Sequence, residues 1–427
     1  MKRRMNRRQF SAGVLAMGVT AVTARSARAV RGANERIRTG VIGCRNRGWQ
    51  DAESFQKSGR FEIAAFCDCD AAMLDAGLKN LEGKLPATPR PERDFRRVLD
   101  DPSVDAVIIA TPDHWHALMA VMALQAGKHV YLEKPVSFDI EDGKAIVAAR
   151  QRHPKLAVAV GTQQRSGRHF VEAKQFIDAG GVGRIGFARA WFVSNRQVVP
   201  VVPDGDPPET LAYDMWLGPA PKRPYNVNRV HYNWHFFRDT GTGDAGNWGA
   251  HWLDVVRWYA ELGLPRAAAG FGGQYIVRDA KEWPDTQTVL FDFGTMTVAW
   301  EMRHWSRFPI NGMSGGAEIG GDKGTVVIDR GGWAFFPRDG KAEPVRHKGS
   351  ELDVPHVTNF ADCIGGAKPA ADIVEGHRTA VLCHLANLAT LFNRRIEFDA
   401  ATETIRNDPE AARLAGREYR SPWKMPT

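Results

Sequence analysis

Glycines and a carboxylate occur at a spacing that suits phosphate and ribose binding. Residues 40–48 read Gly-Val-Ile-Gly-Cys-Arg-Asn-Arg-Gly, so Gly43 and Gly48 take the first and third glycine positions of a dinucleotide fingerprint. Asp68 follows Gly48 by twenty residues, where a carboxylate accepts hydrogen bonds from ribose hydroxyls. Arg45 replaces the middle glycine, and its charge either faces phosphate or swings outward. The pattern predicts a dinucleotide site at this loop.

Two further polar clusters follow apolar segments that read as strands. Residues 111–116, Thr-Pro-Asp-His-Trp-His, come directly after the apolar segment 104–110. Residues 133–135, Glu-Lys-Pro, come at the end of the next such segment. If these strands are parallel, both clusters lie at carboxyl ends, where open α/β sheets bind their ligands. We therefore expect both clusters to line one crevice with the glycine loop.

A histidine and an asparagine share one face of a helix that we predict over residues 246–262. Asn247, His251 and Asp254 are spaced i, i+4 and i+7, which places them on one side of an α-helix. A histidine is well suited to accept a proton near neutral pH, whereas an asparagine amide cannot accept one. His251 is therefore a candidate base, and the alternative is a core histidine between neighbouring tryptophans.

Tryptophan is unevenly distributed. Nine of the 13 tryptophans lie between Trp191 and Trp305. Their flat rings stack on the C–H faces of sugars, and they fill cores and subunit contacts equally well. Trp234 and Trp248 are the two that we expect near a ligand.

Neither a metal centre nor a disulfide framework is predicted. His231 and His235 would suit a metal only on a helix, and no acidic or cysteine partner lies at a suggestive spacing. The five cysteines are odd in number and fit no disulfide pattern, so we expect free thiols.

The apolar pattern supplies a scaffold for these residues. From residue 37 to about residue 160, continuous apolar segments alternate with amphipathic ones, which is typical of a parallel sheet covered by helices on both faces. Between residues 266 and 337, closely spaced strands joined by glycine-rich turns indicate a largely antiparallel sheet. The predicted α/β fold is an N-terminal Rossmann, doubly wound parallel sheet in residues 30–160 and a C-terminal α+β domain with a large, mostly antiparallel sheet in residues 161–427. Residues 194–234 read as a long loop that covers a site.

The net charge of +8 does not indicate a nucleic-acid partner. Seven of those charges lie in residues 1–29, which contain no acidic residue. This segment combines the pair Arg7-Arg8, an uncharged stretch and the small-x-small sequence Ala27-Arg28-Ala29, the layout of a twin-arginine signal peptide. We therefore predict a periplasmic or exported protein, and the alternative is a basic tail. No apolar run reaches the ~18 residues of a membrane span.

Several motifs occur together in one known family. They comprise the segments 111–116 and 133–135, residues 161–165, the helix at 246–254, Pro284-Asp285-Thr286, residues 320–325 and residues 375–378. In these motifs the chain resembles the Gfo/Idh/MocA family of oxidoreductases, which includes glucose–fructose oxidoreductase and inositol dehydrogenase. The resemblance covers roughly residues 36 to 395.

The resemblance implies roles for individual residues. Lys134 matches a lysine that lies beside the nicotinamide and assists the hydride step, and His251 matches the histidine that takes the proton from the sugar hydroxyl. Asn247 stands where the family commonly has an aspartate, so we expect it to complete the catalytic set by hydrogen bonding. The expected cofactor-binding residues are Gly43, Arg45, Asn46, Gly48, Asp68, Thr111, Pro112, His116, Glu133, Lys134 and Gln163.

The predicted function is an NAD(P)-dependent oxidoreductase that transfers hydride between a sugar or polyol hydroxyl and a tightly held nicotinamide cofactor. NAD is expected because Asp68 would repel a 2′-phosphate, and NADP is the alternative because Arg45 and Arg47 carry positive charge. Two other functions remain open: a redox-neutral NAD-dependent glycoside hydrolase, and a sugar-binding or sensing protein without turnover. The expected partners are a small-molecule sugar or polyol and, by analogy with the family, further copies of the chain in a homo-oligomer.

Overall fold

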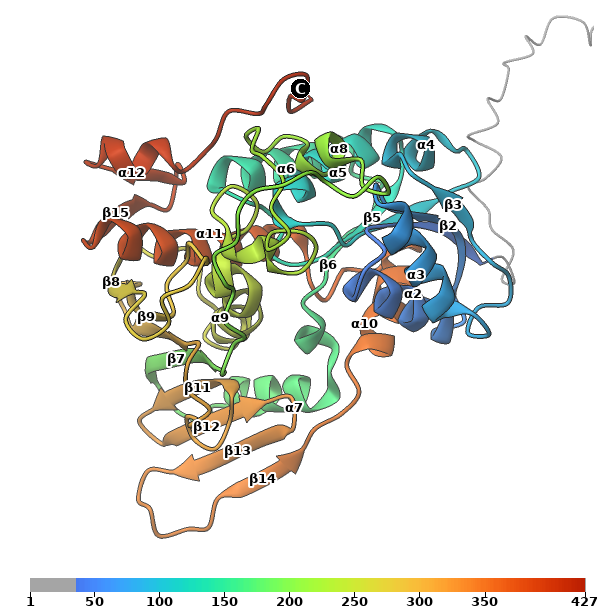
Figure 1. Cartoon of the computed structure of the whole chain (residues 1–427). Coiled ribbons are helices and arrows are strands. Elements are labelled where there is room, and N and C mark those ends of the chain that lie inside the picture. Colours follow the sequence, from blue (N-terminus) through green and yellow to red (C-terminus); the bar gives the residue numbers. More distant parts are fainter. Residues whose placement is uncertain (1–35, 427) are drawn as a thin grey trace, which may run out of the picture. The chain divides into compact units, whose positions relative to one another are not determined.

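The chain folds around two β-sheets, which Figure 1 shows in blue to cyan and in green to red. The computed structural model describes residues 36–426, and the residues from Ile37 onward form one compact unit. The predicted signal peptide, residues 1–29, lies outside the described residues. The α/β fold class, with one parallel and one mostly antiparallel sheet, is confirmed.

The first sheet has six parallel strands in the order β3-β2-β1-β4-β5-β6. The strands are β1 (Ile37–Ile42), β2 (Phe61–Cys67), β3 (Arg90–Glu92), β4 (Ala106–Ile109), β5 (His129–Leu132) and β6 (Val158–Val160). The order reverses between β1 and β4. In doubly wound sheets, the carboxyl ends of the strands at such a reversal form the crevice that binds ligands.

Helices of the first sheet begin at well-defined caps. They are α2 (Arg47–Lys57), α3 (Ala71–Leu81), α4 (Phe95–Asp100), α5 (Asp113–Gln125) and α6 (Ile140–Arg152). The side chains of Asp70, Asp94 and Asp139 accept hydrogen bonds from first-turn amides of α3, α4 and α6, which satisfies donors that a helix leaves free. Helix α5 starts after Pro112 and is buried along most of its length, so its polar residues must find partners inside the protein.

The second sheet has ten strands in the order β14-β13-β12-β11-β7-β10-β9-β8-β15-β16. They are β7 (Ile185–Val193), β8 (Ala267–Gly273), β9 (Thr286–Asp292), β10 (Thr297–Arg303), β11 (Gly315–Gly321), β12 (Gly324–Asp329), β13 (Gly332–Pro337), β14 (Val345–Lys348), β15 (Ile396–Asp399) and β16 (Thr404–Arg406). Neighbouring strands are antiparallel except β7 and β10, which pair in parallel. The sequence analysis missed β7, because glycine, alanine and arginine weaken its strand signal.

Helices α7 (Arg168–Asp178), α9 (Ala250–Tyr259) and α11 (Ile373–Phe392) pack against strands of the second sheet. Their apolar side chains meet the sheet in one core, in which Trp252 and Leu253 of α9 join Val298 and Trp300 of β10. Short helices occur at α8 (Tyr213–Leu217), η2 (Gln163–Ser166), η3 (Asn233–Phe236) and α12 (Pro409–Arg413). None of the helices described in residues 36–426 has the length and apolar character needed to span a membrane.

The helix predicted over residues 246–262 differs from the observed one. Residues Ala245–Gly249 form a π-helical turn, η4, and α9 follows it. Its wider turn changes the angular spacing between Asn247 and the residues of α9. Asp254, the third residue of the predicted face, accepts hydrogen bonds from Arg165 Nε at 2.7 Å and Nη2 at 2.9 Å.

The last part of the chain packs on both sheets. Figure 1 shows α10 (Asp353–Ile364) beside α2, and Phe360 of α10 contacts Phe55 and Phe61 in the core of the first sheet. Near the chain end, the ring of Trp423 lies 4.8 Å from that of Trp115 on α5. β6 ends at Val160, and a domain boundary after that residue stays a prediction.

Candidate active site

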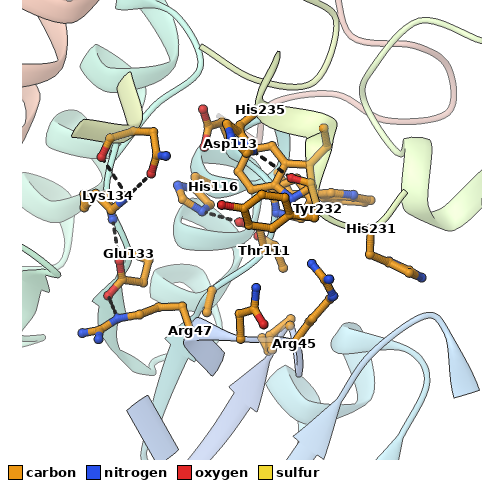
Figure 2. Close-up of a pocket in the computed structure, with 18 of the residues that line it drawn as sticks. Arg45, Arg47, Thr111, Asp113, His116, Glu133, Lys134, His231, Tyr232 and His235 are labelled. Carbon is orange, nitrogen blue, oxygen red and sulfur yellow. Dashed lines mark hydrogen bonds and ion pairs between the residues drawn. The ribbon is translucent and has the colours of Figure 1, made fainter. Parts of the chain in front are cut away.

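One cavity of about 390 Å³ opens at the carboxyl ends of β1, β2, β4 and β5. A cavity of this size holds a small-molecule ligand. Figure 2 shows how its polar side chains converge. Of the residues that the sequence predicts for the site, those that line this cavity are Gly43, Arg45, Asn46, Asp68, Thr111, Pro112, His116, Glu133, Lys134, Gln163, Asn247 and His251. Gly48 alone does not.

The glycine loop is shaped by close backbone contacts. Gly43 has φ of 92°, and a Cβ there would lie 2.6 Å from the carbonyl oxygen of Ala110. A Cβ on Gly48 would lie 1.8 Å from the carbonyl oxygen of Gly43. Both positions therefore require glycine, Gly43 for the turn into the site and Gly48 for the approach of α2 to the loop.

The two arginines of the loop have different partners. Arg47 Nε donates to Glu133 Oε1 at 2.9 Å, and its Nη2 lies 2.8 Å from Asp51 Oδ1. The Arg45 guanidinium lies 5.5 Å over the ring of Tyr232 and forms no ion pair within residues 36–426 (Figure 2). Arg45 is therefore the loop cation that remains available to a phosphate, while carboxylates neutralise Arg47.

Asp68 is fixed at the end of β2. Its Oδ2 accepts from the amide of Cys44 at 2.9 Å, and its Oδ1 accepts from the amide of Asp70 at 3.0 Å. Burial raises the pKa of Asp68. Its position after the second strand is the one from which a carboxylate contacts the adenosine ribose.

We expect the protein to prefer NAD to NADP. A 2′-phosphate beside Asp68 would meet like charge, and Arg47 is already held by carboxylates. Asp68→Ala should reduce the ratio of the NADP to the NAD dissociation constant by at least about tenfold in calorimetric titrations. Asp100→Ala, which removes an exposed carboxylate outside the cavity, is the matched control. Equal affinity of the unchanged protein for both nucleotides would show that Arg45 outweighs Asp68.

Lys134 is held by an amide that also reaches a buried carboxylate. Lys134 Nζ donates to Asn247 Oδ1 at 2.8 Å and to the Asn247 carbonyl oxygen at 3.0 Å (Figure 2). Asn247 Nδ2 donates to Asp244 Oδ1 at 3.0 Å, and Arg196 Nη2 binds the same oxygen at 2.9 Å. Burial alone would raise the pKa of Asp244, but the charges of Arg196 and His304 hold this pKa far below its usual range.

Lys134 and His251 both have reduced proton affinity. Burial lowers the pKa of Lys134. Burial, followed by the positive charges of Arg330, Lys134 and Arg47, lowers the pKa of His251 well below its usual value. The Nδ1 atom of His251 is buried without a hydrogen-bond partner in the described residues. Both groups are therefore more readily in their neutral, proton-accepting form than an ordinary lysine or histidine.

Several polar atoms of the cavity residues lack a partner. Within residues 36–426, the buried atoms without one include Thr111 Oγ1, Gln163 Oε1, His235 Nε2, Trp248 Nε1 and His251 Nδ1. Buried polar atoms in native proteins are nearly always hydrogen-bonded. A dinucleotide and a hydroxylated substrate would offer donors and acceptors to these atoms, so the residues present fit such ligands.

His116 joins two of the strand ends that the sequence predicts to meet. Its Nδ1 lies 2.6 Å from the Pro135 carbonyl oxygen, and its Nε2 lies 2.8 Å from that of Thr111. Glu133 is enclosed by Gly161, where a Cβ would lie 2.4 Å from the carboxylate. Both side chains position the crevice wall.

The two aromatic residues expected near a ligand, Trp234 and Trp248, line the cavity. The ring of Trp248 stacks on Phe192, with centroids 4.3 Å apart and planes at 8°. Trp252 and Trp300, in contrast, are buried in the core.

The histidine pair considered for a metal is not arranged for one. His231 Nε2 lies 2.7 Å from Asp70 Oδ2, and His235 belongs to η3 and not to a helix shared with His231. Among the residues that the structure describes, no three His, Cys, Asp or Glu side chains form a group that would hold a metal ion.

Some cavity residues were missed by the sequence analysis. Arg196 and Tyr232 lie in the predicted covering loop, but nothing in the sequence indicated which of its side chains turn inward. Asp244 does not line the cavity but binds Asn247 from just before the predicted helix, and the sequence analysis did not single it out. Arg330 lies in a turn between two strands, where an arginine is unremarkable.

Comparisons with known proteins agree with this geometry. Residues 37–162 match the model described as "Oxidoreductase family, NAD-binding Rossmann fold", and residues 184–263 and 348–425 match "Oxidoreductase family, C-terminal alpha/beta domain". The chain is 32% identical over 123 residues to an inositol 2-dehydrogenase of Salmonella typhimurium, which is 29% of this chain and 35% of the relative. It is 31% identical over 125 residues to glycosyl hydrolase family 109 protein 1 of Shewanella sp., which is 28% of this chain and 27% of that one. The matches thus span well under half the length of these curated relatives.

The fold also matches solved structures. A crystal structure of aldose-aldose oxidoreductase from Caulobacter crescentus, complexed with glycerol, aligns with a TM-score of 0.65 at 19% identity, over 85% of this chain and all of that one (100%). At that identity the likeness concerns the fold. The two family matches together cover more than half of the chain, including the first sheet and strands β7, β15 and β16 of the second. The chain therefore belongs to the Gfo/Idh/MocA oxidoreductase family, and its first sheet is the NAD-binding Rossmann fold of that family.

Proposed function

We propose that the protein transfers a hydride between a CH–OH group of a sugar or polyol and a tightly held nicotinamide cofactor. The observation that carries the proposal is the pair Lys134 and His251, which line one cavity and both have a lowered pKa. Oxidation of an alcohol requires a group that takes the hydroxyl proton as the hydride leaves. The match to an inositol 2-dehydrogenase supports a polyol or sugar as the substrate class.

The bonds of Lys134 suit a part in proton transfer. A charged ammonium has three donors, and Asn247 accepts two of them through its side-chain and backbone oxygens. The remaining N–H of the ammonium can donate to a substrate oxygen. After loss of a proton, the two bonds to Asn247 persist and a lone pair replaces the third donor. Lys134 can therefore switch between donor and acceptor without moving.

His251 would act as the base. A bound nicotinamide supplies the hydride acceptor. The imidazole of His251 accepts the hydroxyl proton, while Lys134 Nζ hydrogen-bonds the substrate oxygen and Asn247 keeps the lysine in place. To test the proposal, the nucleotide released on denaturation should be identified, and reduction of the bound cofactor should be followed with a panel of sugars and polyols. Absence of both nucleotide binding and reduction would refute it.

We further propose that residues 1–29 direct export and that the cofactor is bound before export and then retained. An exported enzyme leaves the cytoplasmic nicotinamide pool, so each hydride must be returned in the same site. Contacts beside Asp68, where the adenosine of the nucleotide would bind, support slow release of the cofactor. The Ala71 amide donates to Thr210 O at 3.0 Å, the Ala212 amide donates to Cys69 O at 3.0 Å, and His231 contacts Asp70.

Protein purified with residues 1–29 present should therefore keep about one nucleotide per chain through dialysis, because covering segments slow its dissociation. Substrate should change the nicotinamide absorbance once, without sustained turnover, until an acceptor is added. His231→Ala should speed nucleotide loss, whereas His347→Ala, on exposed β14, should not. A stable apoprotein that needs added NAD for steady turnover would contradict retention.

The match to a glycosyl hydrolase family 109 protein favours a second candidate, a redox-neutral glycoside hydrolase. In such a reaction a ring CH–OH is oxidised to a ketone as its hydride leaves, and loss of the acidified neighbouring proton then expels the aglycone by elimination. Water adds to the resulting double bond, and the hydride returns to the ketone of the same sugar. Release of nitrophenol from an aryl glycoside without net change in nicotinamide absorbance would support this candidate. Oxidation of a free sugar, with hydride passed to an added aldose, would favour the oxidoreductase.

A further inference from the structure

The reacting end of the cavity contains a guanidinium that no carboxylate neutralises. Arg330 lines the cavity but remains exposed, which places it at an opening. Its guanidinium lies 5.6 Å over the ring of Trp248, and that ring lies 5.9 Å from the ring of His251. Within residues 36–426, Arg330 forms no ion pair. From this arrangement we propose that the substrate is a sugar or polyol that carries a carboxylate, and that Arg330 binds it. This inference rests on the proposed oxidoreductase function.

The backbone presents Arg330 rigidly. Arg330 and Gly331 are the two residues that join β12 to β13. Asp329 Oδ1 accepts from the Gly331 amide at 2.8 Å, and the Gly349 amide donates to the Gly331 carbonyl oxygen at 2.6 Å. His169 Nε2 also lies 3.1 Å from the Asp329 carbonyl oxygen. A turn fixed from two sides holds its arginine ready for a ligand, which lowers the entropy lost on binding.

The acidic side chains nearby are already engaged. Asp353 and Glu133 are the carboxylates whose charges act on Arg330, and both pair with Arg47. Asp113 Oδ2 accepts from the Thr242 hydroxyl at 2.6 Å and from its amide at 3.1 Å. Arg330 and Lys134 are therefore left without a carboxylate partner at the reacting end. An anionic substrate would complement the positive charges of Arg330 and Lys134, whereas a neutral sugar would leave the Arg330 guanidinium paired only with water.

A substrate carboxylate would also strengthen the proposed base. The charge of Arg330 is the first cause, after burial, of the lowered pKa of His251. A carboxylate on Arg330 would cancel much of that charge and so raise the proton affinity of His251 in the complex. The acidic substrate thus makes His251 a better base only when it is bound.

The single charge of Arg330 favours a carboxylate over a phosphate. One guanidinium offers two parallel N–H donors, which match two oxygens of either group, but its one positive charge balances only the single charge of a carboxylate. A phosphate has three oxygens and a higher charge, and Arg330 is the one arginine over Trp248 among the described residues. Phosphate-bearing sugars therefore serve as a comparison in the test.

The test uses cofactor-loaded protein and matched probes. D-glucuronate is compared with D-glucose, D-galacturonate with D-galactose, and D-gluconate with D-glucitol, with D-glucose 6-phosphate as the phosphate probe. Binding is measured by tryptophan fluorescence and calorimetry, and turnover by nicotinamide absorbance. The variants are Arg330→Gln and Arg330→Lys. Arg338→Gln, at the opposite end of the same hairpin and outside the cavity, is the control.

In at least one pair, the unchanged protein should bind the acid at least about tenfold more tightly than its neutral partner. Arg330→Gln should remove this preference, Arg330→Lys should keep part of it, and Arg338→Gln should keep all of it. With the acidic substrate, the acid limb of kcat should lie at higher pH than that of kcat/KM, because kcat reports His251 in the complex. Arg330→Gln should bring the two limbs together.

Three results would overturn the inference. The first is equal binding, or no binding, of the acid and neutral members of every pair. The second is tighter binding of glucose 6-phosphate than of every acid. The third is loss of nucleotide affinity in Arg330→Gln with unchanged acid preference, which would assign Arg330 to the cofactor. If neutral sugars still reduce the bound nucleotide, the proposed function stands while this inference fails. If the protein binds no nucleotide, the proposed function itself fails.

Discussion

Lys134→Ala is expected to lower kcat by about 10²- to 10⁴-fold while nucleotide binding changes little. The lysine lines the cavity, and its Nζ is bound by Asn247 and not by the glycine loop. Its loss removes the group that can donate to or accept from the substrate oxygen. Stopped-flow reduction of the bound cofactor measures the chemical step, and fluorescence of bound NADH measures affinity.

Two controls show whether Lys134→Ala acts on the chemical step or on folding. Lys144→Ala removes a lysine on α6 that pairs with Glu141 outside the cavity, and it should leave kcat unchanged. In Lys134→Ala, small primary amines should restore part of the activity, because the shortened side chain leaves room beside Asn247. Activity of Lys134→Ala within a few-fold of the unchanged protein would remove this lysine from the mechanism.

The alternating strands and helices of the first sheet could be predicted because most of them have a recognisable sequence pattern of their own. Strand β4 is apolar throughout, and three of the helices, α3, α4 and α6, are capped by aspartates. Elements without such a pattern were missed. In β7, glycine, alanine and arginine interrupt the strand-forming residues, and the contribution of α10 to the first core depends on contacts between residues far apart in sequence.

The candidate site was predictable where chain position alone determines it. Residues that follow parallel strands must gather at one edge, so Thr111, Glu133 and Lys134 were expected beside the glycine loop. Asn247 was recognised by its position in the family motif, but its bond to Asp244 was not, because nothing in the sequence indicates that this aspartate turns toward the amide. The exposed guanidinium of Arg330 belongs to a hairpin turn, and its approach to Trp248 is a property of the tertiary fold.

His251→Ala is expected to abolish the acid limb of the pH profile together with most of the activity. In the unchanged protein, burial and the charges of Arg330, Lys134 and Arg47 lower the pKa of His251, so the base stays unprotonated at lower pH than an ordinary histidine. The acid limb of kcat/KM, which reports the free protein, should therefore lie below the ordinary histidine value of about 6.5. The alanine variant should lack this limb and should gain activity as the pH rises, since hydroxide or an ionised substrate replaces the base.

A second variant, Arg330→Gln, tests whether the acid limb of kcat/KM reports the imidazole of His251. Replacing Arg330 by glutamine removes a positive charge beside His251, which raises the pKa of the imidazole and moves the acid limb of kcat/KM to higher pH. Arg338→Gln, outside the cavity, should leave the limb in place. An acid limb that persists in His251→Ala would belong to another group, and an unmoved limb in Arg330→Gln would show that His251 does not titrate under the influence of Arg330. Movement of the limb in Arg330→Gln together with its loss in His251→Ala would identify the imidazole as the base.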